Sequence, residues 1–320
     1  MKTAIITGIS GQDGHYLARL LLSKGYFVVG TSRKPNILFE GINDHDRSLT
    51  EIVEWNLVDQ SALLDIIKKY KPAEIYNLAA LSSGSMMFEN PVQMMEINGL
   101  AVTKILDVIR RDSPQTKFCQ ASSSEVFGAT PESPQNEDSI CLPSNPYGAT
   151  KLYADHLINI FRNKYGIYAS TAILYNHESL IRPLDFVTRK ITYTAAKIKL
   201  GLAKDLILGN LDTVRDWSFA GDAVHAMWLI LQQKKSDRYI VSSGIPHSVR
   251  QFCEIAFSRL YLDYLQYVRE DERFYRPAEP VARIGNPQKI KSIGWAAQYS
   301  FSDLVHLMVD HDLKDLASSL

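Results

Sequence analysis

The chain opens with Thr3-Ala4-Ile5-Ile6-Thr7, followed at once by Gly8-Ile9-Ser10-Gly11-Gln12-Asp13-Gly14. The first stretch is apolar or β-branched and predicts a buried strand, and the glycines predict a tight turn into a helix. A helix that begins there directs free N–H groups and a positive dipole at the turn, which suits a pyrophosphate. Between a first strand and a first helix, the spacing Gly-x-x-Gly-x-x-Gly favours a dinucleotide site formed by Gly8, Gly11, Gln12, Asp13 and Gly14.

Short apolar runs alternate with stretches of helical periodicity through the first half of the chain. The expected strands are 3–7, 26–31, 52–54, 74–78, 117–122 and 168–174. The expected helices are 16–24, 61–70, 92–111 and 147–165. This alternation predicts an α/β fold of the Rossmann type, a doubly wound parallel sheet with helices on both faces.

The regular alternation weakens after about residue 175, where prolines interrupt it. We expect a nucleotide-binding domain over 1–175, with a return to it at 213–243 that includes a strand at 239–242. Residues 176–212 and 244–320 are expected to form a smaller C-terminal lobe that binds the substrate. That lobe would end in an amphipathic helix at 302–316.

Composition limits the classes of function. Lys+Arg and Asp+Glu both number 35 among 320 residues, so the net charge is zero. A strong basic field for nucleic acid or for a membrane surface is therefore not expected. The first residues carry an apolar run too short for a signal peptide, and the three dispersed cysteines suggest neither a disulfide framework nor a zinc site. We expect a cytoplasmic protein without a metal.

The end of the second expected strand bears on the choice of cofactor. An enzyme that uses NAD places a carboxylate there for the ribose 2′-hydroxyl, whereas NADP requires cations for the 2′-phosphate. The chain has Gly30-Thr31-Ser32-Arg33-Lys34, without an acid. The pattern favours NADP bound by Arg33 and Lys34, and the alternative is a pair of solvated loop charges.

A tyrosine and a lysine stand four residues apart at the start of the expected helix 147–165. Tyr147 and Lys151 would lie on one helix face, where a nearby ammonium favours the phenolate and makes the tyrosine a base for an alcohol. The chain contains this spacing a second time, at Tyr193 and Lys197. Only the first pair follows the fifth strand of the series, so we expect the second pair to lie on an ordinary helix surface.

Three serines and a glutamate follow the fifth expected strand, in Ser122-Ser123-Ser124-Glu125. Because the carboxyl ends of parallel strands face the ligand crevice, these side chains are candidates for acid–base work. The alternative is a serine-rich turn with an exposed glutamate.

Together these motifs resemble the extended short-chain dehydrogenase/reductase superfamily. Further stretches resemble its GDP-mannose 4,6-dehydratase family more narrowly: Tyr175-Asn176-His177-Glu178-Ser179, Phe186-Val187-Thr188-Arg189-Lys190, Leu208-Gly209-Asn210-Leu211-Asp212, Arg215-Asp216-Trp217 and Phe274-Tyr275-Arg276-Pro277-Ala278-Glu279. The resemblance covers nearly the whole chain.

The resemblance implies an internal redox cycle on a GDP-sugar with tightly held NADP. Tyr147, assisted by Lys151, would deprotonate the C4 hydroxyl while hydride leaves C4. The C4 ketone acidifies C5–H, and Glu125 would remove that proton. Ser123, at the place of the family's threonine, would help the C6 hydroxyl to leave as water before hydride returns to C6. The implied product from GDP-mannose is GDP-4-keto-6-deoxymannose.

The resemblance also implies binding residues. Cofactor contacts would extend to Asn56, Leu57, Leu78, Ala79, Ala80, Ser82, Lys151, His177 and Arg182. Substrate contacts would be Asn176, Lys190, Arg215, Arg276 and Glu279. Residue by residue, other interpretations stand: a satisfied core histidine at position 177, a surface pair formed by Arg215 and Asp216, and a solvated helix charge at position 190.

One departure from the family pattern keeps an alternative substrate open. The stretch Leu81-Ser82-Ser83-Gly84-Ser85-Met86-Met87-Phe88 suggests a reshaped sugar pocket, so a GDP-mannoheptose is an alternative substrate. A GDP-4-keto-6-deoxy-sugar reductase and a nucleotide-sensing scaffold are alternative functions on the same fold. We expect a homodimer or homotetramer, because relatives pair the helices 92–111 and 147–165. The apolar residues Leu152, Leu157, Ile158 and Phe161 extend beyond one narrow stripe.

Overall fold

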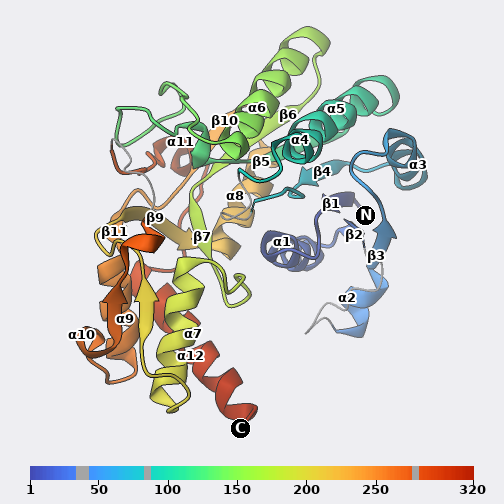
Figure 1. The fold of residues 1–320 in the computed structure, drawn as a ribbon. Coiled ribbons are helices and arrows are strands. Elements are labelled where there is room, and N and C mark those ends of the chain that lie inside the picture. The colour runs from blue at the N-terminus through green and yellow to red at the C-terminus, as the bar shows by residue number, and fades with distance from the viewer. Residues whose placement is uncertain (34–42, 83–87, 276–280) are drawn as a thin grey trace.

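A seven-stranded parallel sheet forms the centre of the molecule in the computed structural model, which describes residues 1–33, 43–82, 88–275 and 281–320 (Figure 1). Its strands are β1 (Thr3–Thr7), β2 (Phe27–Ser32), β3 (Thr50–Glu54), β4 (Glu74–Asn77), β5 (Lys117–Ser123), β6 (Ala169–Leu174) and β10 (Arg238–Val241). They lie in the order β10-β6-β5-β4-β1-β2-β3, and all neighbours are parallel. The predicted Rossmann-type fold is confirmed, and the strand order reverses between β1 and β4, where such sheets bind nucleotides.

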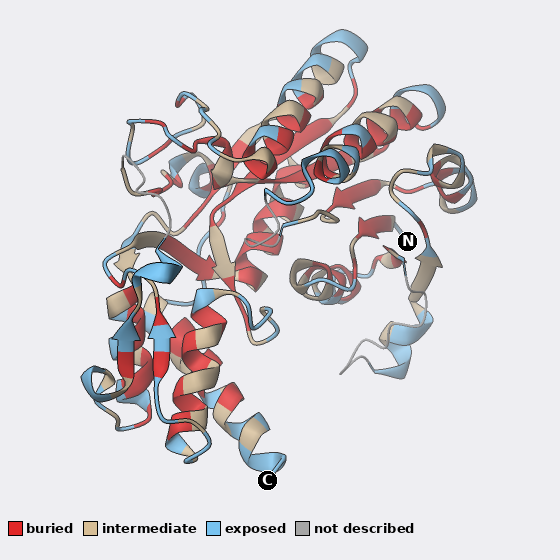
Figure 2. Cartoon of the chain, viewed as in Figure 1, coloured by how far each residue is buried: buried red, intermediate tan, exposed pale blue. Residues whose placement is uncertain are grey.

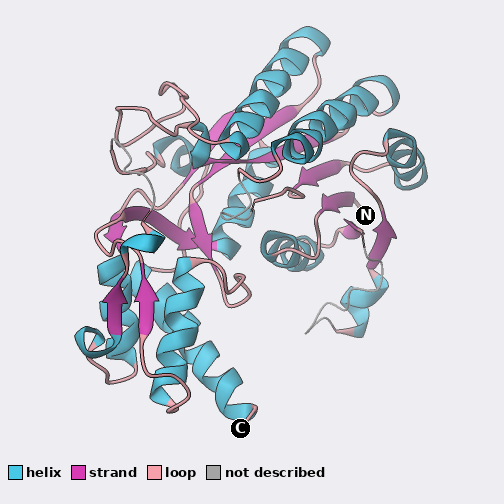
Figure 3. Ribbon diagram, viewed as in Figure 1, coloured by secondary structure: helices cyan, strands magenta, loops and turns pink. Residues whose placement is uncertain are grey.

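Helices cover both faces of this sheet, as Figure 3 shows. On one face lie α1 (Gln12–Ser23), α8 (Ala220–Gln232) and α11 (Gln288–Ser292), and on the other α3 (Gln60–Tyr70), α5 (Ala101–Asp112) and α6 (Pro146–Tyr165). The inner strands are sandwiched between these helices, so most of their side chains are buried and they are mostly red in Figure 2, whereas the edge strand β3 is only partly buried. A short helix, α2 (Asp44–Ser48), precedes β3.

The expected helix at 92–111 is present, but it contains a π-helical turn that was not predicted. It consists of α4 (Pro91–Met95), a π-helical turn over Glu96–Leu100, and α5. Within the turn, the buried Asn98 side chain accepts a hydrogen bond from the Leu81 N–H at 2.9 Å and donates to the Leu81 carbonyl at 3.0 Å. The wider turn thus places a side chain against the segment that follows β4, a long-range contact that helical periodicity does not encode.

The apolar side chains of α6 also lie differently from the expectation. Ile158 is 1% exposed, and Leu157 and Phe161 pack against the core beside α3 and α5. Leu152 packs against a small cluster around Phe127. The exposed apolar side chains of these helices are instead Val92, Leu100, Ile160 and Tyr165.

The remaining segments form a second group of elements at the carboxyl side of the sheet (Figure 1). It contains the three-stranded sheet β7 (Asn176–Glu178), β9 (Val214–Phe219) and β11 (Pro246–Ser248) and the pair β8 (Leu206–Leu208) and β12 (Val268–Glu270). Its helices are α7 (Val187–Lys199), α9 (Val249–Arg259), α10 (Tyr264–Tyr267) and α12 (Phe301–Ser318), and α7, α9 and α12 share a core. Nowhere in the described ranges does a helix have the length and apolar character needed to cross a membrane.

Candidate active site

The turn after β1 has the close packing that a phosphate-binding loop requires. Gly8 has a φ of 69°, and a Cβ at this position would lie 2.8 Å from the Ala79 Cα. A Cβ on Gly14 would lie 2.5 Å from the Ile9 Cα, so helix α1 packs directly on the turn. Gly11 caps α1 without a side-chain hydrogen bond, which leaves the first N–H groups of the helix to bind an anion.

A chain of buried hydrogen bonds crosses the carboxyl ends of β1, β4 and β5. The Thr7 hydroxyl donates to Asn77 Oδ1 at 2.6 Å, and the Asn77 side-chain amide donates to Gln120 Oε1 at 2.7 Å. The Gln120 amide then donates to the Ala121 carbonyl at 2.8 Å, and that oxygen also accepts from Lys151 Nζ at 2.7 Å. The network fixes the lysine ammonium relative to three strands of the sheet.

Helix α6 begins in a way that places Tyr147 and Lys151 beside β5. The side chain of Asn145 caps the helix by accepting from the Gly148 N–H at 2.8 Å. Gly148 has no room for a side chain, because a Cβ there would lie 2.3 Å from the Glu125 carbonyl oxygen. The helix therefore approaches the residues after β5 as closely as its backbone allows.

Burial sets the protonation of this pair. Tyr147 is 9% exposed and Lys151 is 2% exposed, and the ammonium lies 5.5 Å from the centre of the tyrosine ring. Burial raises the pKa of Tyr147 well above its ordinary value, which a hydrogen bond to the Ser123 side chain partly opposes. Burial lowers the pKa of Lys151 to about 8, against the charge of Asp13, which favours the ammonium.

Glu125 lies next to this pair, in the short helical turn Ser124–Val126. Its carboxylate accepts from the Asn145 amide at 2.8 Å and forms an ion pair with Arg283, and its N–H donates to Ser123 Oγ at 3.2 Å. Burial alone would raise the pKa of this carboxyl, but the Arg283 guanidinium and the Asn145 amide hold it below its ordinary value. The structure thus brings the four residues predicted as catalytic, Ser123, Glu125, Tyr147 and Lys151, into one group.

Two residues that contact Glu125, Asn145 and Arg283, were not predicted as part of the site. Asn145 could have been found from the sequence, since an asparagine directly before a proline at a helix start is typical of a cap. Arg283 carries no local signal, because only the tertiary fold brings its segment to the residues after β5.

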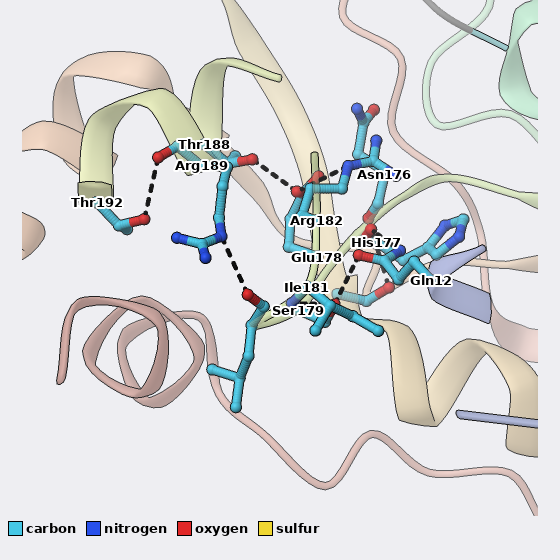
Figure 4. Close-up of polar contacts among 12 residues, drawn as sticks. Gln12, Asn176, His177, Glu178, Ser179, Ile181, Arg182, Thr188, Arg189 and Thr192 are labelled. Carbon is cyan, nitrogen blue, oxygen red and sulfur yellow. Dashed lines mark hydrogen bonds and ion pairs between the residues drawn. The ribbon is translucent and has the colours of Figure 1, made fainter. Parts of the chain in front are cut away.

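Figure 4 shows a second polar cluster, which joins the turn after β1 to β7 and the residues that follow it. His177 Nε2 lies 2.9 Å from the Asp13 carboxylate, and its Nδ1 lies 2.7 Å from the Tyr175 carbonyl. Ser179 donates to Gln12 at 2.7 Å. Although burial lowers the pKa of His177, Asp13 raises it to a net value above the ordinary one, and the pKa of Asp13 is correspondingly lowered.

The same cluster continues toward the C-terminal helix (Figure 4). Glu178 is fully buried, pairs with Arg182 at 3.2 Å and accepts from the Thr188 hydroxyl at 2.6 Å. Arg189 donates to the Leu180 carbonyl at 3.1 Å and forms a buried ion pair with Asp312 of α12. The loop that carries Arg182, a predicted cofactor residue, is therefore fixed at both ends.

The other predicted binding residues lie in three places. Arg33, Asn56 and Leu57 follow β2 and β3, and Leu78, Ala79, Ala80 and Ser82 follow β4, at the carboxyl edge of the sheet. Asn176 of β7 pairs with Trp217 of β9, the strand that also carries Arg215, and Lys190 of α7 donates to the Ile207 carbonyl at 2.7 Å. Lys34, Arg276 and Glu279, and most of the stretch 81–88, lie outside the described residues.

The interpretation of Arg215 and Asp216 as a surface pair is wrong. Asp216 is fully buried and accepts from the N–H groups of Ser243 at 2.8 Å, Gly244 at 2.9 Å and Gly285 at 3.2 Å. Asp216 therefore holds the backbone segments around β9 together and is not part of a surface ion pair. Arg215 is half-buried and donates to its neighbour's carbonyl, that of Val214, at 2.8 Å.

The chain matches the GDP-mannose 4,6 dehydratase family over residues 5–308. It is 42% identical over 326 residues to GDP-mannose 4,6 dehydratase 2 of Arabidopsis thaliana, an alignment that covers 98% of this chain and 87% of the plant protein. The chain belongs to the GDP-mannose 4,6-dehydratase family. Another family member, GDP-mannose 4,6-dehydratase of Vibrio cholerae, is 36% identical, with 98% of this chain and 94% of that protein covered. The predicted resemblance is confirmed.

Solved structures agree with this family on the fold. UDP-glucose 4-epimerase of Thermus thermophilus in complex with NAD superposes with a TM-score of 0.83 at 22% identity, covering 97% of this chain and 98% of that chain. RMD of Pseudomonas aeruginosa complexed with NADPH superposes with a TM-score of 0.82 at 20% identity, covering 98% and 100%. At these identities the likeness concerns the fold alone.

Proposed function

We propose that this chain is an NADP-dependent GDP-mannose 4,6-dehydratase, a lyase that converts GDP-mannose to GDP-4-keto-6-deoxymannose. The observation that carries the proposal is the convergence of Ser123, Glu125, Tyr147 and Lys151 in one group in a member of this family. A base for an alcohol and a base for a carbon acid are what oxidation at C4 and dehydration across C5 and C6 require.

The turn after β1 fits a nicotinamide dinucleotide. Its glycines leave no space for side chains, and α1 offers unpaired N–H groups, so its donors suit a diphosphate. Gly8, Gly11 and Gly14 would hold the diphosphate, and the residues after β2, β3 and β4 would hold the ribose and adenine. When bound, the nicotinamide accepts a hydride from C4 and returns it to C6.

The preference for NADP rests on the end of β2. Ser32 ends the strand and Arg33 follows it, exposed, where a 2′-phosphate would lie. The absence of an acid from Gly30 to Lys34 in the sequence leaves no acceptor for the free 2′-hydroxyl of NAD.

Tyr147 would remove the proton of the C4 hydroxyl. Because burial disfavours its phenolate, the tyrosine depends on nearby cations, and the Lys151 ammonium supplies one. With a pKa of about 8, Lys151 is mostly charged at neutral pH and can also donate a hydrogen bond to a ribose or sugar hydroxyl.

Glu125 would act in the second step. Its lowered pKa keeps it a carboxylate at neutral pH, ready to take the C5 proton once the C4 ketone has acidified it. Ser123 bonds to both Tyr147 and the Glu125 N–H, so it would stand between the two bases and assist the leaving C6 hydroxyl.

The decisive experiment supplies GDP-mannose with NADP or NAD and follows loss of water by mass spectrometry. We expect dehydration, faster with NADP. The variant Glu125→Gln should still oxidise C4, because Tyr147 is intact, but an amide cannot accept the C5 proton. Reduced nicotinamide absorbance should therefore accumulate with a 4-keto sugar that retains its C6 hydroxyl, and deuterium exchange at C5 should be suppressed.

Several outcomes would change the proposal. Dehydration by Glu125→Gln at near the wild-type rate would assign the C5 base to another residue. Turnover of a GDP-mannoheptose but not of GDP-mannose would keep the mechanism and replace the substrate. Stoichiometric consumption of NADPH on a 4-keto-6-deoxy sugar would identify a reductase, which the sequence relatives do not favour.

We also propose a cytoplasmic homo-oligomer, at least a dimer. The exposed apolar side chains Val92, Leu100, Ile160 and Tyr165 on α4 to α6 support a helix-mediated contact between two copies. Sedimentation at micromolar protein should give a mass of at least twice that of the chain, and charged substitutions at Val92 and Ile160 should lower it. A monomer in the wild type would contradict this.

A further inference from the structure

Arg283 is a buried cation whose role neither the sequence motifs nor the proposed function accounts for. Its side chain is 8% exposed and forms an ion pair with Glu125. A guanidinium is rarely buried without a function or a fixed partner, because desolvation costs free energy that only good geometry offsets.

The backbone on both sides of this arginine is held in place. The Gln135 N–H donates to the Ile284 carbonyl at 2.8 Å, and the Asn286 N–H donates back to the Gln135 carbonyl at 2.7 Å. The Gly285 N–H donates to the buried Asp216 carboxylate at 3.2 Å. The segment is thus anchored to two other parts of the fold, so the guanidinium presents a fixed donor rather than a mobile surface charge.

Glu125 meets directional donors on two sides. Arg283 pairs with one carboxylate oxygen and the Asn145 amide donates to the other at 2.8 Å. Two such donors fix the plane of the carboxylate, since each oxygen has its own partner. Among the residues that the structure describes, the charged and titratable groups that act on Glu125 are Arg283 and, more weakly, Arg215, both of which favour the anion, and Tyr147, whose phenolate would repel it.

This arrangement has opposing effects on proton abstraction. The cation keeps Glu125 ionised in a partly buried site, where burial would otherwise favour the neutral acid. The same cation reduces the basicity of the carboxylate, so the step proceeds at a lower pH with a weaker base. A fixed orientation compensates, since a base held in one position needs less reorganisation to reach the transition state.

We propose that Arg283 is a positioning residue for the C5 proton transfer: its guanidinium holds Glu125 as a carboxylate in a fixed orientation, so that the C-terminal part of the chain controls the dehydration step. The proposal rests on the proposed function for the identity of the step. The effect of Arg283 on the charge of Glu125 is independent of the proposed function.

The test compares Arg283→Met and Arg283→Lys with the wild type. Carboxyl titration by infrared difference spectroscopy without sugar follows Glu125, and Glu125→Gln identifies its band. Dehydration of GDP-mannose is measured from pH 5 to pH 9. A matched control is Arg238→Met, which removes a half-buried arginine that pairs with Asp155 at 3.4 Å, away from Glu125.

We expect the Glu125 band to titrate at higher pH in Arg283→Met. The ratio of kcat at pH 8 to kcat at pH 5.5 should rise about tenfold over the wild type, because a contacting arginine shifts a carboxyl by about one to three pH units. Arg283→Lys should keep the acid limb of the wild-type pH profile, because the positive charge remains. Its kcat should fall by a larger factor than its KM changes, since an ammonium lacks the planar guanidinium geometry that orients the carboxylate. If Arg283→Met does not fold, Arg283→Gln carries the same expectation.

The inference would be overturned if Arg283→Met had the same Glu125 titration and the same acid limb of kcat as the wild type. It would also be overturned if Arg238→Met shifted both by as much as Arg283→Met does. Failure of the proposed function has a different signature. In that case the wild type would not dehydrate GDP-mannose, while the infrared titration would still separate Arg283→Met from the wild type and support the effect on charge.

Discussion

The two Tyr-x-x-x-Lys pairs of this chain have the same spacing and almost the same local geometry. In α6, the Lys151 ammonium lies 5.5 Å from the centre of the Tyr147 ring, and in α7 the Lys197 ammonium lies 5.7 Å from that of Tyr193. What differs is the surroundings. The first pair is buried beside Ser123 and Glu125, whereas the second is half-buried on the flank of a helix.

The difference shows that the Tyr-x-x-x-Lys motif only places the two side chains on one helix face, whereas the fold determines their burial and their polar partners. A helix brings any residues four apart to one face. Only in α6 does that face meet the carboxyl edge of the parallel sheet, where the Ala121 carbonyl, Ser123 and Glu125 converge. Burial there shifts the pKa values of both members, which is typical of catalytic groups.

The strongest test of the comparison removes one hydroxyl from each pair. Tyr147→Phe should lower kcat by about 10²- to 10⁴-fold, because the base for the C4 hydroxyl is lost, and NADP should stay oxidised in the presence of GDP-mannose. Tyr193→Phe should stay within about twofold of the wild type. Steady-state kinetics and nicotinamide absorbance measure both. Equal losses in the two variants would show that the burial of the first pair does not distinguish it.

A weaker effect concerns stability against pH. Because burial lowers the pKa of Lys151 to about 8, the unfolded chain binds more protons at this residue than the folded chain between pH 8 and about 10. The free energy of unfolding therefore gains a contribution that rises with pH over this window, on the order of 2 kcal/mol. Below pH 8, the cost of burying the ammonium is fully present.

Urea denaturation from pH 7.5 to pH 9.5 measures this contribution. The curve of Lys151→Met should rise less steeply with pH than that of the wild type, and Lys197→Met should parallel the wild type. The same slope in Lys151→Met and the wild type would mean that Lys151 is not desolvated in the folded protein.

The smallest effect sharpens the comparison through Asp13, the anion that opposes the burial of Lys151. Asp13→Asn should let Lys151 lose its proton at lower pH, so the alkaline limb of kcat should move down by about half a pH unit. The effect is smaller than for contacting charges because Asp13 pairs directly with His177 instead. A pH profile of dehydration measures it. Movement of the limb to higher pH would contradict the assignment of that limb to Lys151.

Much of the fold could be predicted because its signals are local. The strands at 3–7, 74–78 and 117–122 and the helix at 147–165 were placed within a residue or two, because β-branched runs and helical periodicity act over short distances. The π-helical turn within the helix at 92–111 could not be predicted, because the contact that its Asn98 makes with Leu81 is not encoded in helical periodicity.

The sequence by itself determined the glycine turn, the order of the strands and helices, and the candidate pair of Tyr147 and Lys151, since each depends on residues close together in the chain. Only the tertiary structure decided which cation pairs with Glu125 and how far Tyr147 and Lys151 are desolvated. Asp13 with His177 and Arg283 with Glu125 join residues far apart along the chain. Their charges and pKa values depend on desolvation and on partners that only folding brings into contact.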